Sequence, residues 1–356
     1  MPQITQIPGN TPLNTVPHDY FPEGCGFWFE LSKGIDKGKK LFFRDSIHGK
    51  GTYDDTLLFI HGNPECSYSY RKVIDSLVKI IKIPVRIVNP DHIGFGLSDQ
   101  ASHEMVCMDH AENLLELITK LDLNNITMVI HDWGGPIGIG TLLKSPNRLK
   151  NLIVLNSTVF PLSYHGLTYK NYPISWLGWA QTPHIIPDRF WGSFASYAMF
   201  AQPIGSMKLL FGMLKYILKA ELGKLPKNEY NIRSVLKQQF LSKYNVKSSK
   251  RLVMQSAVWG HGNTYTDPKI GKRTTKSFYD FIQKNIKSSW SGNSNRIGVH
   301  AVIGKWDPLG KESVLKQWLQ ALPQLKNNLT FFSDVGHFIE EIKYNEIADV
   351  ILKSIT

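Results

Sequence analysis

Short runs of consecutive apolar residues alternate along the chain with segments in which apolar residues recur every third or fourth position. The first pattern predicts buried strands and the second predicts amphipathic helices. Strands are predicted over 26–31, 39–47, 56–60, 85–91, 126–131, 149–156, 298–304 and 329–334, and helices over 109–121 and 135–145. Buried strands that alternate with helices are typical of a mostly parallel sheet covered on both faces, so the pattern predicts an α/β fold.

This alternation breaks in the segment 161–292, which is rich in lysine and aromatic residues. Residues 161–300 contain 20 Lys and Arg against 5 Asp and Glu, a net charge of +15, whereas the remainder has 21 against 24 and a net charge of −3. Because composition and charge change at the same boundaries, we predict a core formed by 1–160 and 293–356 and an insertion over 161–292.

The 356 residues are 42% hydrophobic, enough for one large core with a sizeable insertion. No apolar stretch is long enough for a membrane span, and the N-terminus lacks the basic start and apolar centre of a signal peptide, so we expect a cytoplasmic protein. Cys25, Cys66 and Cys107 lack the spacing of a metal site and are expected to be free thiols. The basic residues are accompanied by no nucleic-acid motif, so no nucleic-acid partner is expected.

The stretch MVIHDWGGPIG, which begins at Met128, places a carboxylate between an apolar strand and two glycines. A strand that enters a helix through such a turn forms a nucleophile elbow, which lifts one side chain above the edge of the sheet. Asp132 occupies the nucleophile position, and Gly134 permits a close approach on its far side. The alternative is that Asp132 caps the following helix.

A nucleophile of this type requires an oxyanion hole, an acid and a histidine base, in the chain order nucleophile, acid, histidine. The motif HGNP follows a central strand, where the backbone N–H and side-chain amide of Asn63 can point at the reaction centre. Asp307 in GKWDP and His337 in DVGHF each follow a late strand. Both therefore lie where open α/β sheets build their sites, although Asp307 could be a plain turn residue and His337 a surface histidine.

Together, HGNP, PDHIGFGLSD, HDWGG, GKWDP and DVGHF resemble the haloalkane dehalogenases of the α/β-hydrolase fold, over most of 25–160 and 295–350. Within that family the chain is most similar to the third subfamily, which grades into the β-lactone decarboxylases of bacterial olefin biosynthesis. The resemblance implies a mostly parallel sheet flanked by helices, with 161–292 as a helical cap over the site. It implies no metal and no cofactor.

The resemblance also implies the role of each site residue. It makes Asp132 the nucleophile, His337 the base, Asp307 the acid, and Asn63 and Trp133 the halide-binding donors, with backbone N–H groups of the last two as the oxyanion hole. Trp133 could instead only fill the core, and Asn63 could stabilise its own turn. Another subfamily keeps its acid after the strand 149–155, where Asn156 stands here and cannot serve.

A carboxylate can displace a leaving group from a saturated carbon and form an ester that water then cleaves. The expected substrate is therefore an sp3 electrophile, whose leaving group could be a halide, an epoxide oxygen or a lactone oxygen. The resemblance implies a small apolar substrate, a haloalkane or a long-chain lactone, with water as the second reactant and halide as the product of a haloalkane. A β-lactone decarboxylase would use the same residues, and an epoxide hydrolase would add a tyrosine from Tyr164, Tyr169, Tyr172 or Tyr197. From a different class, the chain could be an inactive hydrolase-fold binding protein.

The clearest helix of the insertion is predicted over 206–224. Its lysines and its apolar residues lie on different sides: Lys208, Lys215 and Lys219 on one, and Leu209, Leu210, Phe211, Met213, Leu214, Ile217 and Leu218 on the other. Three interpretations stay open: a helix packed on the core with solvated lysines, a helix lining a long apolar tunnel, or an interfacial helix that touches an anionic membrane. The oligomeric state is not predicted.

Overall fold

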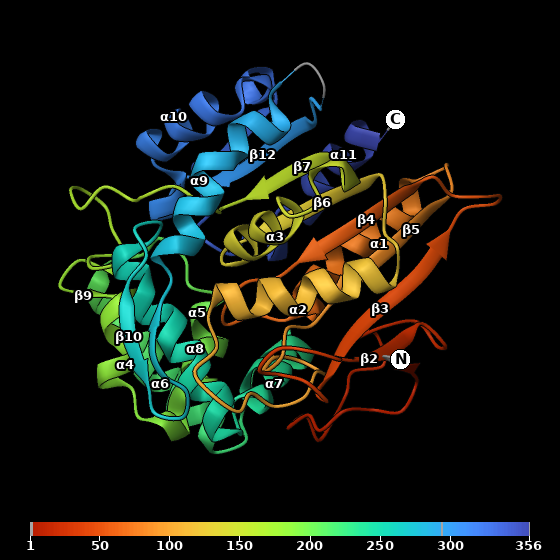
Figure 1. Ribbon diagram of the computed structural model, residues 1–356. Helices are drawn as coiled ribbons and strands as arrows, with labels where there is room; N and C mark the ends of the chain where they lie inside the picture. Colours follow the sequence, from red (N-terminus) through yellow and green to blue (C-terminus); the bar gives the residue numbers. More distant parts are fainter. Residues whose placement is uncertain (1–2, 293–294, 356) are drawn as a thin grey trace.

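A single nine-stranded sheet forms the centre of the molecule (Figure 1). The computed structural model describes residues 3–292 and 295–355. In order across the sheet, the strands are β1 (Ile4–Thr5), β2 (Gly26–Glu30), β3 (Lys40–His48), β5 (Val85–Pro90), β4 (Asp55–Ile60), β6 (Ile126–His131), β7 (Leu149–Leu155), β12 (Gly298–Gly304) and β13 (Leu329–Phe332). The six strands from β5 to β13 pair in parallel, and β1, β2 and β3 form an antiparallel edge.

Helices cover both faces of the sheet because alternate strand residues point to opposite sides and most residues of the central strands are apolar. On one face, α1 (Arg71–Ile80) and α11 (Tyr344–Ile355) pack over strand residues such as Phe59 and Val129. On the other face, α2 (Cys107–Lys120), α3 (Gly134–Leu142) and α9 (Lys276–Trp290) pack over residues such as Ile60 and Ile130. The predicted α/β fold with a mostly parallel sheet is therefore confirmed.

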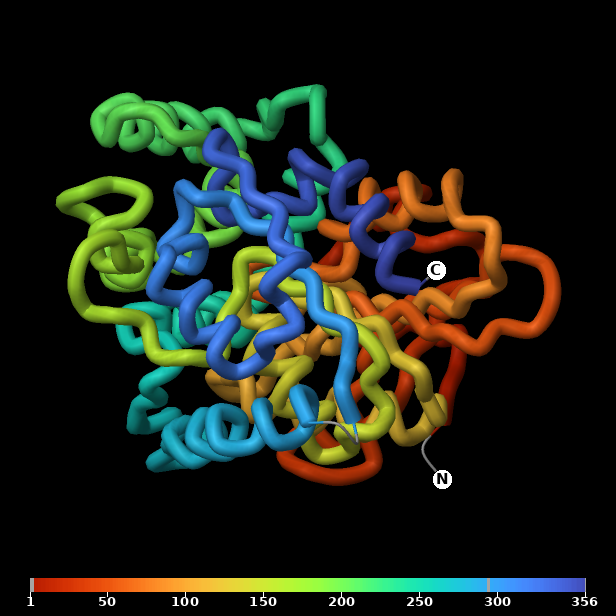
Figure 2. The backbone as a smooth tube through the Cα atoms, turned by 90° about the horizontal axis from the view of Figure 1, so that it is seen from above, coloured from red at the N-terminus to blue at the C-terminus, as the bar shows by residue number. Residues whose placement is uncertain are grey.

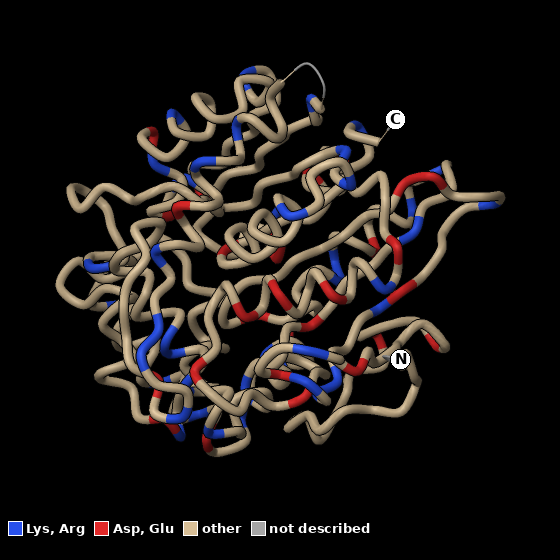
Figure 3. Tube along the Cα trace, in the orientation of Figure 1, with Lys and Arg blue, Asp and Glu red and all other residues tan. Residues whose placement is uncertain are grey.

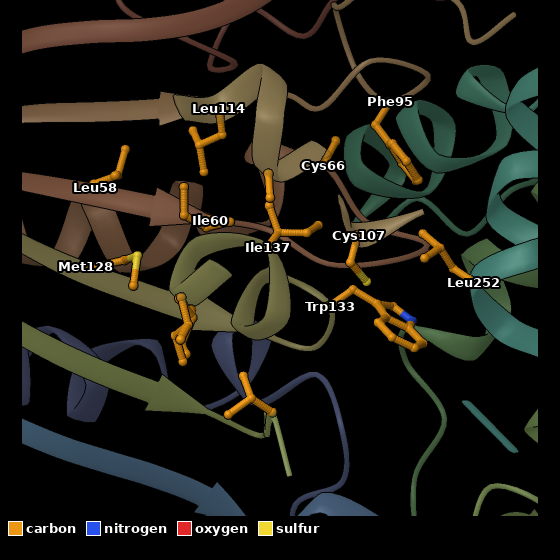
Figure 4. Close-up of a cluster of buried hydrophobic side chains, with 14 of the residues drawn as sticks. Leu58, Ile60, Cys66, Phe95, Cys107, Leu114, Met128, Trp133, Ile137 and Leu252 are labelled. Carbon is orange, nitrogen blue, oxygen red and sulfur yellow. The ribbon is translucent and has the colours of Figure 1, made fainter. Parts of the chain in front are cut away.

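The segment between β7 and α9 lies over the carboxyl ends of the parallel strands. It contains β8 (Pro173–Ile174), β9 (Leu177–Gly178), α4 (Thr182–Ile185), α5 (Trp191–Ala198), α6 (Ser206–Glu221), α7 (Tyr230–Gln239), α8 (Lys243–Gln255), β10 (Thr264–Asp267) and β11 (Gly271–Thr274). Outside this segment, α10 (Glu312–Ala321) lies between β12 and β13 along the chain. In Figure 4, Leu252 of α8 approaches Trp133 and Cys107, so the core cluster continues into this segment.

Polar contacts also fasten this segment to the core. Arg273 forms an ion pair with Asp109 at 2.5 Å, and Arg251 forms one with Glu104 at 2.6 Å. The segment therefore has a fixed place relative to the sheet. The predicted division at 160 and 292 stays a prediction, and α9, which falls within the predicted insertion, packs against α3 of the core.

The charge distribution follows the sequence prediction. Figure 3 shows Lys and Arg at many positions of the segment that contains α6, α7 and α8, whereas acidic residues are few there. Among the described residues, no helix is both long and apolar enough to cross a membrane. The cysteines Cys25, Cys66 and Cys107 are free thiols, as predicted.

Candidate active site

Asp132 sits at the turn between β6 and α3 in the left-handed backbone region, with φ of +50°. The turn is tight: a Cβ at Gly134 would overlap the backbone of Ile60, and one at Gly135 would overlap the hydroxyl of Ser157. Trp133, and not Asp132, is the N-cap residue of α3, and no side-chain hydrogen bond caps this helix. The turn therefore has the form of a nucleophile elbow, and the Asp132 carboxylate is used elsewhere.

The three predicted triad residues meet although they come from separate strands. His337 Nε2 lies 3.1 Å from Asp132 Oδ2, and His337 Nδ1 lies 2.8 Å from Asp307 Oδ2. Asp307 is fully inaccessible and Asp132 is 3% exposed, whereas His337 is partly buried, with 10% of its side chain exposed. The histidine thus bridges two carboxylates, the arrangement in which one orients the ring and the other reacts.

The two carboxylates control the charge of His337. Burial by itself disfavours the imidazolium and lowers the pKa, but Asp307 and Asp132 outweigh burial, so the pKa of His337 is raised well above its usual range. In the unreacted site at neutral pH, His337 is therefore protonated. Loss of the charge on Asp132 would remove one of the two groups that hold this proton.

Asn63 and Trp133 flank the carboxylate, as predicted. The backbone N–H of Asn63 donates to Asp132 Oδ1 at 2.7 Å, and the Asn63 amide makes only a long contact of 3.4 Å to the Ser249 carbonyl. Trp133 is 1% exposed and stacks on Trp259 at 4.0 Å between ring centroids. Within the described residues, its indole N–H has no hydrogen-bond acceptor, which leaves this donor available for a ligand.

Two residues that sequence reasoning did not assign to the site hold Asp307 in place. Asn156, with φ of +32°, donates to Asp307 Oδ2 at 2.8 Å and also bonds both backbone groups of Gly304. Tyr169 donates its hydroxyl to Asp307 Oδ1 at 2.9 Å. Asn156 stands at the position predicted above to lack an acid. Its amide instead donates to Asp307, which follows β12. No sequence signal indicated Tyr169 as a partner of Asp307.

A second buried cluster lies beneath His337. His131 Nδ1 lies 2.5 Å from Glu65 Oε1, and His131 Nε2 lies 2.8 Å from the backbone carbonyl of His337 and 3.5 Å from Glu340. Glu65 also accepts the Gly62 N–H at 2.9 Å, so the cluster connects the Asn63 loop, the elbow and the His337 loop. No local sequence signal pairs His131 with Glu65 and Glu340, which come from different parts of the chain.

The charges in this cluster are distributed unequally. Burial raises the pKa of Glu340 to about 8, and neither of its oxygens has a hydrogen-bond partner in the described part of the chain. Burial opposes ionisation of Glu65 and His131 too, but the attraction between them wins, which lowers the pKa of Glu65 to about 2. Attraction to Glu340, in the state in which that group is ionised, and to Glu65 outweighs burial and raises the pKa of His131 to about 9.

These three residues are close enough to share a metal ion, since their ligand atoms lie within 4.8 Å of one another. However, both ring nitrogens of His131 already face hydrogen-bond partners, which leaves no lone pair for a metal. The cluster is therefore better described as a glutamate–histidinium ion pair beside a protonated glutamic acid.

A largely apolar cavity of about 440 Å³ opens beside the triad. Its inner end is formed by His337, Phe338, Tyr169 and Tyr172, and its walls come mainly from α4, α5 and α6. The space around Asp132 itself is closed by packing, with Asn63 and Trp133 each 1% exposed. A substrate carbon would therefore reach Asp132 only after side chains at the inner end of the cavity have moved.

The sheet, the elbow at Asp132 and the position of His337 after the last strand agree with comparisons to known proteins. A family model described as alpha/beta hydrolase fold matches residues 55–197. The solved structure of the tetrameric haloalkane dehalogenase DpaA from Paraglaciecola agarilytica NO2 aligns with a TM-score of 0.63 at 21% identity, over 96% of this chain and 97% of that one. The chain has the α/β-hydrolase fold.

Two sequence relatives match part of the chain. Over 129 residues the chain is 36% identical to the cis-3-alkyl-4-alkyloxetan-2-one decarboxylase of Shewanella oneidensis, covering 35% of this chain and 38% of that protein. Over 115 residues it is 34% identical to the haloalkane dehalogenase of Psychrobacter cryohalolentis, covering 32% and 37%. The matches span less than half the length of each relative. The predicted resemblance to both groups is confirmed.

Proposed function

We propose that the protein is a haloalkane dehalogenase-type hydrolase that acts through a covalent ester on Asp132. The observation that carries this proposal is the contact of His337 with both Asp132 and Asp307, beside the donors of Asn63 and Trp133. A carboxylate nucleophile attacks saturated carbon, and the two donors can share the departing halide. No cofactor or metal enters this mechanism.

In the first step, an oxygen of Asp132 bonds to the carbon that bears the halogen, and the carbon–halogen bond breaks with its electron pair leaving on the halide. The Asn63 amide and the Trp133 indole N–H donate to that halide. The indole N–H has no other acceptor among the described residues, so halide binding breaks no existing hydrogen bond there.

The second step is prepared by the first. Alkylation removes the negative charge of Asp132, which is one of the two groups that raise the pKa of His337. The imidazolium can then release its proton to solvent, and the neutral imidazole takes a proton from a water whose oxygen bonds to the ester carbonyl carbon of Asp132. The backbone N–H of Asn63, already 2.7 Å from an Asp132 oxygen, is placed to hold the oxyanion. The alcohol leaves and Asp132 is restored.

The test is halide release from 1-bromo- and 1-iodoalkanes of increasing chain length. Asp132→Ala should abolish release, because no ester can form. His337→Phe should form the ester but fail to hydrolyse it, so intact mass should show one added alkyl group per chain. Asp132→Asn and the wild type serve as mass controls. Absence of release by the wild type, together with an unmodified His337→Phe variant, would reject dehalogenation.

A second function, β-lactone decarboxylation, is favoured by the size of the cavity. Its volume of about 440 Å³ and its mostly apolar lining suit a substrate with long alkyl chains. Attack of Asp132 on the saturated ring carbon that bears the ring oxygen would break that carbon–oxygen bond and release a carboxylate. Loss of carbon dioxide would then expel Asp132 and leave an alkene. Similarity to the Shewanella decarboxylase supports this alternative.

Isotope transfer separates the two functions. Dehalogenation in H₂¹⁸O should place a solvent oxygen in Asp132 after one turnover, because water attacks the ester carbonyl. Decarboxylation consumes no water, so a disubstituted β-lactone should give alkene and carbon dioxide with Asp132 unlabelled. Peptide mass spectrometry of the region around Asp132 measures the label directly.

Epoxide hydrolysis has less support. Tyr169 donates to Asp307, and Tyr197 donates to the Leu209 carbonyl at 2.9 Å. Tyr164 is 57% exposed and stacks on His261. These three hydroxyls are therefore not presented to a substrate oxygen at Asp132, and Tyr172 packs against Trp306 at the inner end of the cavity.

A further inference from the structure

Helix α6 carries an apolar stripe that faces outward. Met207, Phe211, Leu214, Leu218 and Leu222 recur every third or fourth position at its surface and are 52% to 63% exposed. This spacing places all five on one side of the helix. Figure 2 shows the green segment that contains α6 at the outer edge of the molecule. Below, these five residues are called the α6 stripe.

A row of positive charge borders the α6 stripe. Lys208, Lys215 and Lys219 occupy the next sector of the helix, are exposed, and form no ion pair within the described part of the chain. The single acidic residue of the helix, Glu221, is bound by Lys237 at 3.3 Å. The α6 stripe is thus flanked by uncompensated cations inside a segment with a net charge of +15.

Exposed apolar side chains continue beyond the helix. Trp176 is 57% exposed at the tip of the β8–β9 hairpin, and the neighbouring Ser175 N–H contacts the Ser206 hydroxyl at the start of α6 at 3.5 Å. Ile204, 48% exposed, lies two residues before the helix. A tryptophan beside an apolar stripe and a lysine row is the composition that favours a membrane interface.

The α6 stripe is continuous with the substrate cavity. Leu214 and Leu218 belong both to the stripe and to the cavity wall, and Ile185, which is 55% exposed, joins them at the wall. Deeper in the same wall lie Leu210 and Ile217 of the next sector of α6. An apolar molecule could therefore move from the protein surface toward His337 without crossing a polar rim at this helix.

We propose that the α6 stripe and its lysine row dock on an anionic membrane surface, so that the cavity receives apolar substrate from the bilayer. Anionic headgroups would pair with Lys208, Lys215 and Lys219 while the stripe enters the headgroup–acyl boundary. A second copy of the chain fits less well, because two such basic segments facing each other would repel.

The first measurement is co-sedimentation of the full-length protein with vesicles. Vesicles of phosphatidylcholine alone are compared with vesicles that contain phosphatidylglycerol, at low and high salt. Binding to the anionic vesicles should exceed binding to the neutral ones by at least about tenfold at low salt, and the difference should shrink as salt screens the lysines. The assay needs no turnover, so it remains decisive even if the proposed dehalogenation is wrong.

Two sets of substitutions separate the apolar from the electrostatic part. Met207→Gln, Phe211→Gln and Leu222→Gln together change stripe residues that do not line the cavity, and should lower vesicle binding at least about tenfold. Lys208→Gln, Lys215→Gln and Lys219→Gln together should abolish the preference for anionic lipid. Both sets should keep their thermal melting curves, because these side chains are exposed.

Matched controls lie outside the insertion. Ile47→Gln changes an apolar side chain of β3 that is 58% exposed, and Lys33→Gln, Lys50→Gln and Lys326→Gln remove the same charge from exposed positions elsewhere. These controls should bind vesicles like the wild type. Sedimentation velocity of each protein without lipid reports the oligomeric state.

Three results would overturn the proposal. The first is equal, salt-independent binding to neutral and anionic vesicles, or no binding to either. The second is equal loss of binding in the control variants. The third is an oligomer that dissociates when the α6 stripe is changed, since the stripe would then be an interface between copies of the chain.

Discussion

Replacement of Glu340 by glutamine tests how the cluster beneath His337 holds its charges. Glu340 is fully buried, has no hydrogen-bond partner on either oxygen within the described residues, and has a pKa of about 8 in place of the usual 4.5. The folded protein therefore keeps the proton on Glu340 at neutral pH, whereas the unfolded chain loses it. Glutamine has nearly the same shape and is neutral at every pH.

The size of the effect follows from this difference in pKa. Below pH 4.5, both states hold the proton and Glu340 contributes no pH dependence. Between pH 4.5 and about 8, only the folded state holds it, so each pH unit lowers the free energy of unfolding by about 1.4 kcal/mol. From pH 5 to pH 8 the wild type should thus lose roughly 3 kcal/mol through Glu340. His131, whose pKa is raised to about 9, acts in the same direction above pH 6.5.

The assay is urea unfolding at constant ionic strength at pH 5, 6, 7 and 8. Between pH 5 and pH 8, the free energy of unfolding of Glu340→Gln should fall by roughly 3 kcal/mol less than that of the wild type. Glu312→Gln is the matched control, because Glu312 is exposed on α10 and pairs with Lys316 at 2.9 Å. It should leave the pH dependence nearly unchanged.

A Glu340→Gln profile parallel to that of the wild type would refute this reasoning. So would a large loss of stability already at pH 5, because the glutamine would then be replacing an ionised partner of His131. Either result would mean that Glu340 is charged in the folded state and that His131 is held by two carboxylates.

Three further predictions concern the site. Gly62→Ala should lower halide release by about a hundredfold or more with the fold retained, because its Cβ would overlap the Asp132 side chain; activity close to the wild type would contradict this. Tyr169→Phe should reduce kcat by about three- to tenfold, because Asp307 loses one hydrogen bond, and an unchanged kcat would show that Asn156 alone orients Asp307. Ile217→Trp should shift the substrate preference toward shorter alkyl chains, by about fourfold in kcat/KM for each methylene excluded. The bromoalkane series measures this shift, and an unchanged preference would place the alkyl chain of the substrate elsewhere.

Much of the framework was predictable because it depends on local patterns. The apolar residues of the runs that predict β4, β6 and β7 are buried, and the strand–glycine–helix sequence around Asp132 produces the elbow wherever the sheet is placed. The predicted helix 206–224 ends early, at Glu221, because Gly223 adopts a φ of +72° and closes the helix.

The contacts around the triad were not predictable in the same way. Asn156 and Tyr169 meet on Asp307 although they are separated from it by 151 and 138 positions. Glu340 and Glu65 meet His131 from two different loops. Hydrogen bonds of this kind depend on where distant loops end in space, and a single sequence carries no local signal for that.

The sequence by itself determined the order of the main strands along the chain, the helices that follow β6 and precede it, the elbow that presents Asp132, and the residue types available for the reaction, because backbone preference and hydrophobic period act over a few neighbouring residues. Only the tertiary structure decided which side of α6 is buried. Leu209 and Met213 pack inward while Phe211 and Leu218 face solvent, although all four are equally apolar in sequence. That choice depends on which surfaces α5 and the β8–β9 hairpin cover, and therefore on packing between segments distant in sequence.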